Sequence, residues 1–418
     1  MKKLSAVVLL VLFCAIAKGQ NTWTQKTNFG GTARYGATGF SIGNYGYIGL
    51  GWDGSAYQND FWQYDPSNDT WTQKANFAGA GRMTSGFAIG TMGYVGLGQN
   101  GNVYTDFWQY DPSNNSWVQK ANFPGAARYA FSGFAIGAKG YLGLGTSSSS
   151  GPMYNDFYEY DPFNDTWTQK TSFPGAVRTA PAGFAIGQKA WLGMGSDITI
   201  GATYSDWYMY DQSTDSWTQK ANFPGLPRTG FVSFSIGNNG YIGTGGNFTS
   251  SIYYNDFWEY FPAFDSWTQR ASLPASVRWG GVGFFIGTDG YLGTGNTSSS
   301  GPYTNDFWKY TTKENDVAVN ELNNQIQISV YPNPFSGIVT IHSSEKISSI
   351  EIMNVLGEKV YSLNPVGNNS NGVNHLLAHS LIDLSSQPSG VYFLQIKTEP
   401  RRGGDPQGSV VKKIIIQK

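Results

Sequence analysis

The chain contains almost none of the residues on which most catalytic and metal centres depend. Its 418 residues include one cysteine and three histidines. Cys14 lies near the N-terminus, whereas His342, His375 and His379 all lie near the C-terminus. The long region between them therefore excludes a histidine-based catalytic triad, a cysteine nucleophile and a zinc site of the usual ligands. We expect neither a metal nor a cofactor there.

Charged residues are also few, and their signs balance. They make up 13% of the chain, and the formal net charge is −1. A nucleic-acid partner is excluded because phosphate binding requires a basic surface. No segment beyond the N-terminal region is apolar over the ~20 residues that a transmembrane helix needs, so no transmembrane segment is expected.

Residues 1–20 have the three parts of a signal peptide. Two lysines near the start precede an apolar run over residues 4–17, which ends in small residues that suit cleavage. A lipoprotein site at Cys14 is an alternative, but Phe13 is too bulky for the position before such a cysteine. We favour ordinary cleavage, which would leave a mature protein without cysteine and therefore without disulfides.

What the chain does contain is a unit of about fifty residues that occurs six times. Trp-Thr-Gln-Lys or a close variant begins at Trp23, Trp71, Trp117, Trp167, Trp217 and Trp267. An arginine follows each tryptophan at one offset, at Arg34, Arg82, Arg128, Arg178, Arg228 and Arg278. An Asp-aromatic-aromatic segment recurs at Asp60, Asp106, Asp156, Asp206, Asp256 and Asp306. Such a period in a strand-rich chain indicates the blades of a β-propeller.

The third unit shows why each repeat should form one blade. Short strand-like runs cover residues 133–137, 140–145, 156–161 and 167–170, and glycine, proline, asparagine and aspartate occupy the turns between them. Side chains grow along the unit from glycine and alanine to tryptophan, as blades that splay apart toward a rim require. The sequence therefore predicts an all-β fold in which each unit is a four-stranded antiparallel sheet.

The strand count predicts how the ring closes. The chain begins at Trp23 with a strand of the kind that comes fourth in each later unit, and the three strands that would precede it are missing. The last unit has the complementary gap, because it ends after its third strand at Tyr310. We therefore expect residues 21–310 to form a six-bladed β-propeller closed by the N-terminal strand.

The unit resembles a kelch repeat. A tyrosine of the third strand precedes the tryptophan by seven residues, as at Tyr160 and Trp167, and a glycine-rich second strand precedes both. The family's Gly-Gly pair is mostly Gly-x-Gly here, and Gly245-Gly246 comes nearest to the family form. The resemblance implies the propeller fold over about residues 22–310. The copper chemistry of galactose oxidase, a kelch-type enzyme, needs histidine and a Tyr–Cys crosslink that this region cannot supply.

After Tyr310 the repeat stops, and residues 311–325 form a polar linker. Seven strand-like runs follow between Ile326 and Ile416, which predicts a small Ig-like β-sandwich over residues 326–418. His375 and His379 lie in an asparagine-rich stretch that we interpret as a loop, so a solvated pair is favoured over a metal site.

Four segments of this region resemble, in order, the C-terminal sorting domain of type IX secretion substrates. They are residues 331–335, 352–360, 389–392 and 412–415. The resemblance implies a Bacteroidota-type bacterium, passage through the periplasm, export to the outer-membrane surface or the medium, and removal of the domain during attachment or release. The partner that it implies is the type IX secretion machinery. The alternative is an accessory binding sandwich.

Candidate binding residues lie on one face of the predicted ring. The six arginines begin the innermost strands near the central channel, where they could bind an anionic ligand; the alternative is that each bonds to backbone carbonyls or to an acid of the adjacent blade. The residue after each arginine varies, and three are aromatic: Tyr35, Tyr129 and Trp279. Trp52 and Asp53 are unmatched residues of a loop on the same face.

Catalytic residues are not expected. Two carboxylates suffice for glycoside hydrolysis, but most propeller acids recur at equivalent positions. The exceptions, Asp53 and Asp197, fall in blades one and four, on opposite sides of the ring. The sequence thus predicts a secreted or surface-displayed, non-catalytic module that binds a glycan or protein. One alternative is a glycan-active enzyme, such as a lyase or mutarotase, acting through Arg, Tyr and Asp; another is a structural surface-layer component.

Overall fold

The computed structural model divides into two compact units, the first ending at residue 314 and the second beginning at residue 315. It describes residues 21–312, 328–331, 337–343, 347–354, 358–363, 379–398 and 409–416. The predicted signal peptide and most of the predicted linker lie outside these residues. Across the described ranges every regular element is a strand, and no helix there is long and apolar enough to span a membrane.

Five of the blades are four-stranded antiparallel sheets in which the first strand along the chain is innermost and the fourth is outermost. Blade one contains β2 (Thr38–Ile42), β3 (Tyr45–Gly49), β4 (Phe61–Asp65) and β5 (Thr70–Gln73). Blade two contains β6 (Met83–Ile89), β7 (Met92–Gln99), β8 (Phe107–Asp111) and β9 (Ser116–Lys120). Blade three contains β10 (Ser132–Ile136), β11 (Lys139–Gly143), β12 (Phe157–Asp161) and β13 (Thr166–Lys170). The four strands predicted for the third unit are therefore present, with bounds within two residues of those expected.

The next two blades add a short hairpin to the loop after their second strand. Blade four contains β14 (Ala182–Ile186), β15 (Lys189–Gly193), β18 (Trp207–Asp211) and β19 (Ser216–Lys220). Blade five contains β20 (Val232–Ile236), β21 (Asn239–Gly243), β24 (Phe257–Phe261) and β25 (Ser266–Arg270). The hairpins pair β16 (Ser196–Asp197) with β17 (Ala202–Thr203), and β22 (Gly246–Asn247) with β23 (Ile252–Tyr253).

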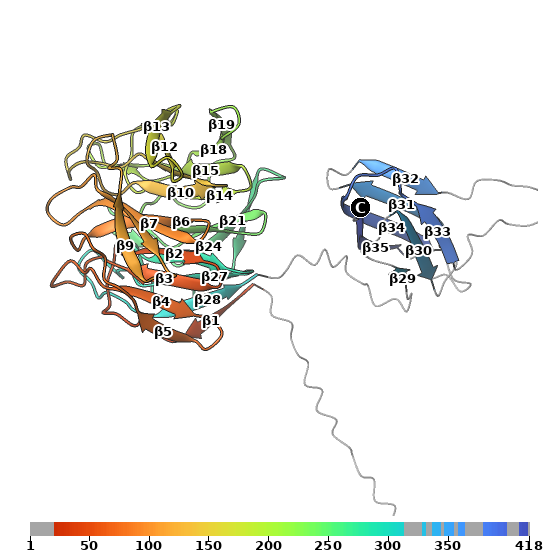
Figure 1. Cartoon of the computed structure of the whole chain (residues 1–418), viewed down its shortest axis with the longest axis horizontal. Coiled ribbons are helices and arrows are strands. Elements are labelled where there is room, and N and C mark those ends of the chain that lie inside the picture. Colours follow the sequence, from red (N-terminus) through yellow and green to blue (C-terminus); the bar gives the residue numbers. More distant parts are fainter. Residues whose placement is uncertain are drawn as a thin grey trace, which may run out of the picture. The chain divides into compact units, whose positions relative to one another are not determined.

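The sixth blade joins the two ends of the propeller and confirms the predicted closure. Its strands are β26 (Val282–Ile286), β27 (Asp289–Gly293), β28 (Phe307–Thr311) and, outermost, β1 (Thr22–Lys26). Trp23 lies opposite Tyr310 in the antiparallel β1–β28 pair, and in Figure 1 the red β1 lies beside the cyan β28. Innermost strands pack in a closed series: β2 on β6, then β10, β14, β20, β26 and back to β2.

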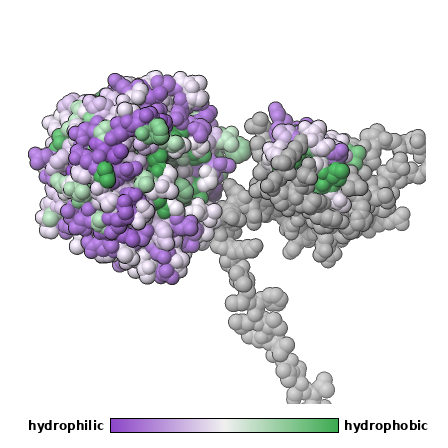
Figure 2. Space-filling view, in the orientation of Figure 1, coloured by the Kyte–Doolittle hydropathy of each residue, from purple (hydrophilic) through white to green (hydrophobic). Residues whose placement is uncertain are grey.

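The recurring tryptophans join neighbouring blades. Trp71 Nε1 donates to Thr27 O (3.1 Å), and the ring packs edge-on against Phe307 of blade six. Trp23 does the same at the closure, donating to Ala271 O (2.8 Å) and packing on Phe257. The other residues of these outer strands are mostly exposed threonine, glutamine and lysine, which protect the sheet edges from further pairing. Hydrophilic residues cover most of the propeller face seen in Figure 2.

The Gly-x-Gly pattern has a physical reason in the second strand of every blade. A Cβ on Gly49 would lie 2.5 Å from the Asp60 carbonyl oxygen, so no side chain fits there. Gly51 has a φ of 93°, a conformation that side-chain-bearing residues rarely adopt. Together the two glycines turn the chain out of the second strand beside the channel mouth, where the variable loops begin.

The second unit contains two sheets around one core. One sheet contains β29 (Ile328–Tyr331), β30 (Ile338–Ser343) and β33 (His379–Asp383). The other contains β32 (Lys359–Leu363), β31 (Ile347–Asn354), β34 (Gly390–Thr398) and β35 (Ser409–Ile416). Residues of both sheets, among them Ile341 and Leu394, are buried in a single cluster. All seven predicted strands are present, and the Ig-like arrangement stays a prediction.

One expectation for this unit was wrong. His379 does not lie in a loop, because it begins β33 and stands opposite His342 in the register of the two strands. His375 lies outside the described residues. No group of three or more potential metal-binding His, Cys, Asp or Glu side chains occurs in the part of the chain that the structure describes.

The closure can be tested with Trp23→Ala. Loss of the ring contacts and of the hydrogen bond to blade five should lower the free energy of unfolding by about 3 kcal/mol, whereas Gln25→Ala on the same strand should change it by less than about 0.5 kcal/mol. Removing residues 21–30 should expose the edge of β28 and cause aggregation. Urea unfolding of the purified propeller measures both substitutions, and equal midpoints for the two would contradict closure through β1.

Candidate ligand-binding site

The six recurring arginines are internal structural residues. Each is at most 1% exposed and forms a two-bond ion pair with the recurring aspartate of its own blade. Arg128 Nη1 and Nη2 bond the two carboxylate oxygens of Asp156, while Nε donates to Ala126 O and Nη1 also donates to Leu144 O. These bonds connect the arginine before the innermost strand of a blade to the aspartate before the third strand of the same blade.

This geometry differs from the sequence expectation in one respect. The acid belongs to the same blade as the arginine, because Arg34 precedes β2 and Asp60 precedes β4 of one sheet. At Asp306, burial raises the pKa, but the hydrogen bond and charge of Arg278, together with hydrogen bonds from Trp308 and Thr304, hold the pKa below its ordinary value. Because the guanidinium N–H groups are used by these partners, the arginines offer little to an anionic ligand.

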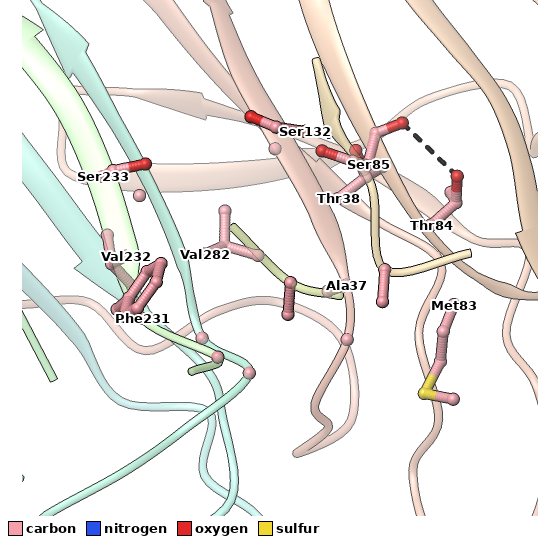
Figure 3. Close-up of a pocket in the computed structure, with 18 of the residues that line it drawn as sticks. Ala37, Thr38, Met83, Thr84, Ser85, Ser132, Phe231, Val232, Ser233 and Val282 are labelled. Carbon is pink, nitrogen blue, oxygen red and sulfur yellow. Dashed lines mark hydrogen bonds between the residues drawn. The ribbon is translucent and has the colours of Figure 1, made fainter. Parts of the chain in front are cut away.

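A cavity of about 460 Å³ lies on the propeller axis and is lined by the innermost strands of all six blades and the residues just before them. Figure 3 shows part of its wall, with the hydroxyl groups of Ser132 and Ser233, which come from different blades, directed toward each other in this view. No charged side chain lines it, and none of the six arginines is among its lining residues. The cavity is therefore suited to an uncharged group.

Four of the six variable residues that follow the arginines lie at this cavity. Tyr35, Met83, Tyr129 and Trp279 all line it, so the structure brings three of the predicted aromatic residues to one site. The ring centroids of Tyr35 and Trp279 are 4.8 Å apart, and those of Tyr35 and Tyr303 are 5.5 Å apart and stacked. Phe248, which is 43% exposed, packs edge-on against Trp279 at 4.8 Å.

These rings form an aromatic sector that we define as Tyr35, Tyr57, Phe248, Trp279 and Tyr303. It extends over blades five, six and one, on one side of the mouth, and Tyr129 lies across the cavity in blade three. Burial raises the pKa of Tyr35, and the neighbouring Tyr303 and Tyr57 raise it further. Burial likewise raises the pKa of Tyr129. Both phenols are therefore neutral over the physiological range of pH.

A shift of one residue explains why two of the loop tyrosines join this sector. In four blades the tyrosine two residues before the aspartate stacks on the arginine of its blade, with ring-to-guanidinium distances of 3.8 to 4.4 Å for Tyr104, Tyr154, Tyr204 and Tyr254. Blades one and six carry Gln58 and Thr304 at that position, and their tyrosines come one residue earlier. Tyr303 instead stacks on Tyr35.

Trp52 and Asp53 lie beside the sector and outside the cavity lining. Trp52 forms backbone bridges with Tyr35 and Tyr57, and its ring lies 4.6 Å from the ring of Tyr57. Asp53 closes its own loop by accepting hydrogen bonds from the Ser55 and Ala56 N–H groups (both 2.9 Å). Burial raises the pKa of Asp53, but these bonds lower it more, so the carboxyl stays ionised.

Asp197, the other unmatched acid, has the same kind of role. It accepts hydrogen bonds from the N–H (2.8 Å) and the hydroxyl (2.6 Å) of Thr199 in the tip of its hairpin. Neither Asp53 nor Asp197 lines the cavity. The two acids hold loops, and the structure does not bring them together.

Comparisons with known proteins support this fold at both ends of the chain. Residues 51–78 match the kelch motif, and residues 329–417 match the secretion system C-terminal sorting domain. The chain therefore combines a β-propeller that carries a kelch motif with a C-terminal region that matches the secretion sorting domain. Among curated proteins none matches. The solved structure of YjhT is similar over 69% of this chain and 98% of its own, with 18% identity and a TM-score of 0.61, which is a likeness of fold.

The sorting domain determines where the protein acts. Its presence indicates export by type IX secretion to the cell surface or the extracellular space.

The structural role of the arginines can be tested with Arg128→Met. Leaving Asp156 without its partner should lower the free energy of unfolding by about 3 kcal/mol. Lys120→Met removes a surface pair with Asp165 and should cost less than about 1 kcal/mol. Guanidinium unfolding curves compare the two variants. If Arg128→Met kept its stability, the arginine would have to be reconsidered as a ligand-binding residue.

Proposed function

We propose that this kelch propeller is a non-catalytic binding module that recognises a neutral carbohydrate at the mouth of its central cavity. The observation that supports this most is the combination of an uncharged cavity with an aromatic rim. Tyrosine and tryptophan rings offer flat apolar faces to the C–H faces of a sugar, and their polar tips offer hydrogen bonds to its hydroxyls. A concave apolar site with a few polar groups is the usual form of a ligand pocket.

The same lining argues against catalysis. Glycoside cleavage uses a pair of carboxylates, and proton transfer in general uses a group whose pKa lies near the working pH. The cavity lining contains no carboxylate, and its two tyrosines have pKa values raised above the ordinary one. An enzyme acting through Arg, Tyr and Asp is disfavoured because the recurring arginines and aspartates bond each other. A purely structural surface component would have no use for a hollow with an aromatic rim.

The export route is part of the proposal. Residues 1–20 act as a signal peptide for entry into the periplasm of a Bacteroidota-type bacterium, and residues 326–418 contact the secretion machinery at the outer membrane. The sorting domain is then removed, so the mature protein is the propeller, released or attached at the surface. Binding therefore takes place outside the cell.

Deleting residues 409–418 tests the export route. This removes β35, which pairs with β34 along its whole length, and with it the end of the sorting domain. We expect the folded propeller to accumulate in the periplasm, as measured by fractionation and immunoblotting of the native host. The exported wild-type protein should lack the domain by mass spectrometry. An intact C-terminus on exported protein would contradict its removal.

The binding site is tested by replacing Trp52 and Trp279 with alanine together. Trp279 supplies a ring of the aromatic sector. Trp52 forms backbone bridges with Tyr35 and Tyr57, and its ring packs against the ring of Tyr57. Loss of one aromatic anchor costs about 2 kcal/mol, or about thirtyfold in affinity, so the double variant should show no measurable binding. The ligand is first selected from an array of neutral and acidic oligosaccharides and peptides, and affinity is then measured by calorimetry.

Phe163→Ala is the matched control, because Phe163 is 94% exposed in a turn between the third and fourth strands of blade three, away from the mouth. It should bind as the wild type does. Full affinity in the Trp52/Trp279 double variant would move the site elsewhere. Selection of peptides alone from the array would replace the carbohydrate with a protein ligand.

A further inference from the structure

Blade two is one residue shorter than the other five blades at the mouth of the cavity. In blade one, Gly36 and Ala37 separate Tyr35, which follows the arginine, from Thr38, which stands opposite the second-strand glycine. The first residue of this pair has a φ between 45° and 66° in five blades: Gly36, Ala130, Ala180, Gly230 and Gly280. In blade two only Thr84 separates the equivalent residues, and the register of β6 and β7 shifts there.

The five left-handed residues all line the cavity and bond to one another around the axis. In three neighbouring pairs the N–H of one residue donates to the carbonyl of its equivalent in the blade before: Gly36 N to Gly280 O (2.8 Å), Gly280 N to Gly230 O (2.7 Å) and Ala180 N to Ala130 O (2.6 Å). Between blades four and five the Thr229 hydroxyl donates to Ala180 O (3.3 Å) instead. The bonds thus connect blades three, four, five, six and one.

Blade two interrupts this series. Its missing residue would bond the Gly36 carbonyl on one side and the Ala130 N–H on the other, and among the described residues neither group has a hydrogen-bond partner. Thr84 does not replace the missing residue, because its hydroxyl donates to Gly96 O within its own blade. Backbone N–H and C=O groups are strong hydrogen-bonding groups. The space between the Gly36 carbonyl and the Ala130 N–H, the blade-two gap, therefore offers one acceptor and one donor at the cavity.

Three phenol groups surround the blade-two gap. Tyr35 and Tyr129 directly precede its two ends, and Tyr57 of the blade-one loop donates to Gln99 Oε1 of blade two (3.5 Å). Burial raises the pKa of Tyr35 and of Tyr129, and the nearby phenol of Tyr57 raises both further. Among the described residues the hydroxyls of Tyr35 and Tyr129 bond to no protein group, and neither oxygen is fully buried. The polar groups around the gap are therefore open to a ligand.

Blade two itself places a flexible side chain beside the gap. A Cβ on Gly36 would lie 2.8 Å from Met83 Sδ, so the methionine packs directly against one end of the gap. Figure 3 shows Met83 and Thr84 on the same side of the cavity. Methionine is unbranched and adapts its shape to what it contacts. A ligand can therefore enter the gap without moving the backbone.

We propose that a neutral sugar bound at the mouth places its hydroxyl groups in the blade-two gap, where the Gly36 carbonyl accepts and the Ala130 N–H donates. The proposal rests on the function proposed above and names the side of the mouth that selects the ligand. A hydroxyl both donates and accepts, as the missing residue of blade two would. A carboxylate only accepts and an ammonium group only donates, so a charged group would leave one end of the gap unpaired.

Inserting one glycine between Met83 and Thr84 tests the gap directly. The insertion gives blade two the length of the other blades, and glycine readily adopts the left-handed conformation that the position requires. Its N–H and C=O would then take the places at Gly36 and Ala130 that we assign to the ligand. The matched control inserts a glycine after Asn114, in the exposed turn between β8 and β9 of the same blade. Calorimetry with the neutral oligosaccharide selected by the array measures affinity, and melting temperatures show whether each variant is folded.

Hydrogen exchange at the Ala130 amide gives a second readout on the unaltered protein. An amide without a partner exchanges fast, and a hydrogen bond slows its exchange. Saturation with the selected oligosaccharide should therefore slow exchange at Ala130 at least about tenfold, and so should the glycine insertion in the absence of ligand. Amide exchange followed by nuclear magnetic resonance measures both.

We expect the insertion after Met83 to weaken binding at least about tenfold and the insertion after Asn114 to leave it unchanged. If the first insertion does not fold, Tyr57→Phe combined with Tyr129→Phe decides, because it removes two hydroxyls and keeps both rings; it should weaken binding at least about fivefold. Unchanged affinity in the folded variant, as expected if water alone occupies the gap, would overturn this inference, as would exchange at Ala130 that the ligand does not slow. The proposed function would survive either result provided that the Trp52/Trp279 double variant still abolished binding.

Discussion

The buried pair between an arginine before the innermost strand and an aspartate before the third is the interaction on which the rest of the propeller depends. Replacing a buried ion pair with apolar groups is often neutral, so its value need not be stability alone. Here the guanidinium also bonds two backbone carbonyls, as Arg128 does with Ala126 and Leu144. The pair therefore fixes the entry of the innermost strand against the strands outside it. In four of the six blades the residue after the arginine, which differs from blade to blade, is thereby held at the cavity.

The tryptophan at the start of each repeat supplies the complementary constraint at the rim. Its N–H bonds a carbonyl of the preceding blade, so every blade is tied to its neighbour by an identical contact, including at the closure through Trp23. Both constraints recur in all six repeats. A repeated frame of this kind leaves the positions between the anchors free to vary, and the variation that matters for binding is found there.

The sequence was sufficient to predict the blades, their closure into a ring and the strands of the second unit, because each of these features has a local or periodic signal. The missing strand at Trp23 predicted the closure, and alternating apolar runs predicted the seven strands of the second unit. The Arg–Asp pairing had no such signal, since six arginines and six aspartates recur with one period and any assignment of partners fits it. The aromatic sector was hidden for a related reason: the tyrosines look like one recurring feature until their offsets from the aspartate are compared.

The innermost strands also pack closely on one another, because the buried residue that stands opposite the second-strand glycine faces a residue of the next blade that has made room for it. A Cβ on Gly86 would lie 2.7 Å from Thr38 Oγ1, and a Cβ on Gly283 or Gly39 would collide with Val232 or Val282 of the preceding blade. Glycine follows this buried residue in every blade except five, where the following residue is Ser233. In the preceding blade four the buried residue is Ala182, the smallest of the six, and Ser233 of blade five uses the space to donate a hydrogen bond to the Gly183 carbonyl oxygen. The size of this buried residue and the size of its neighbour in the next blade thus vary together, which keeps the innermost strands closely packed around the axis.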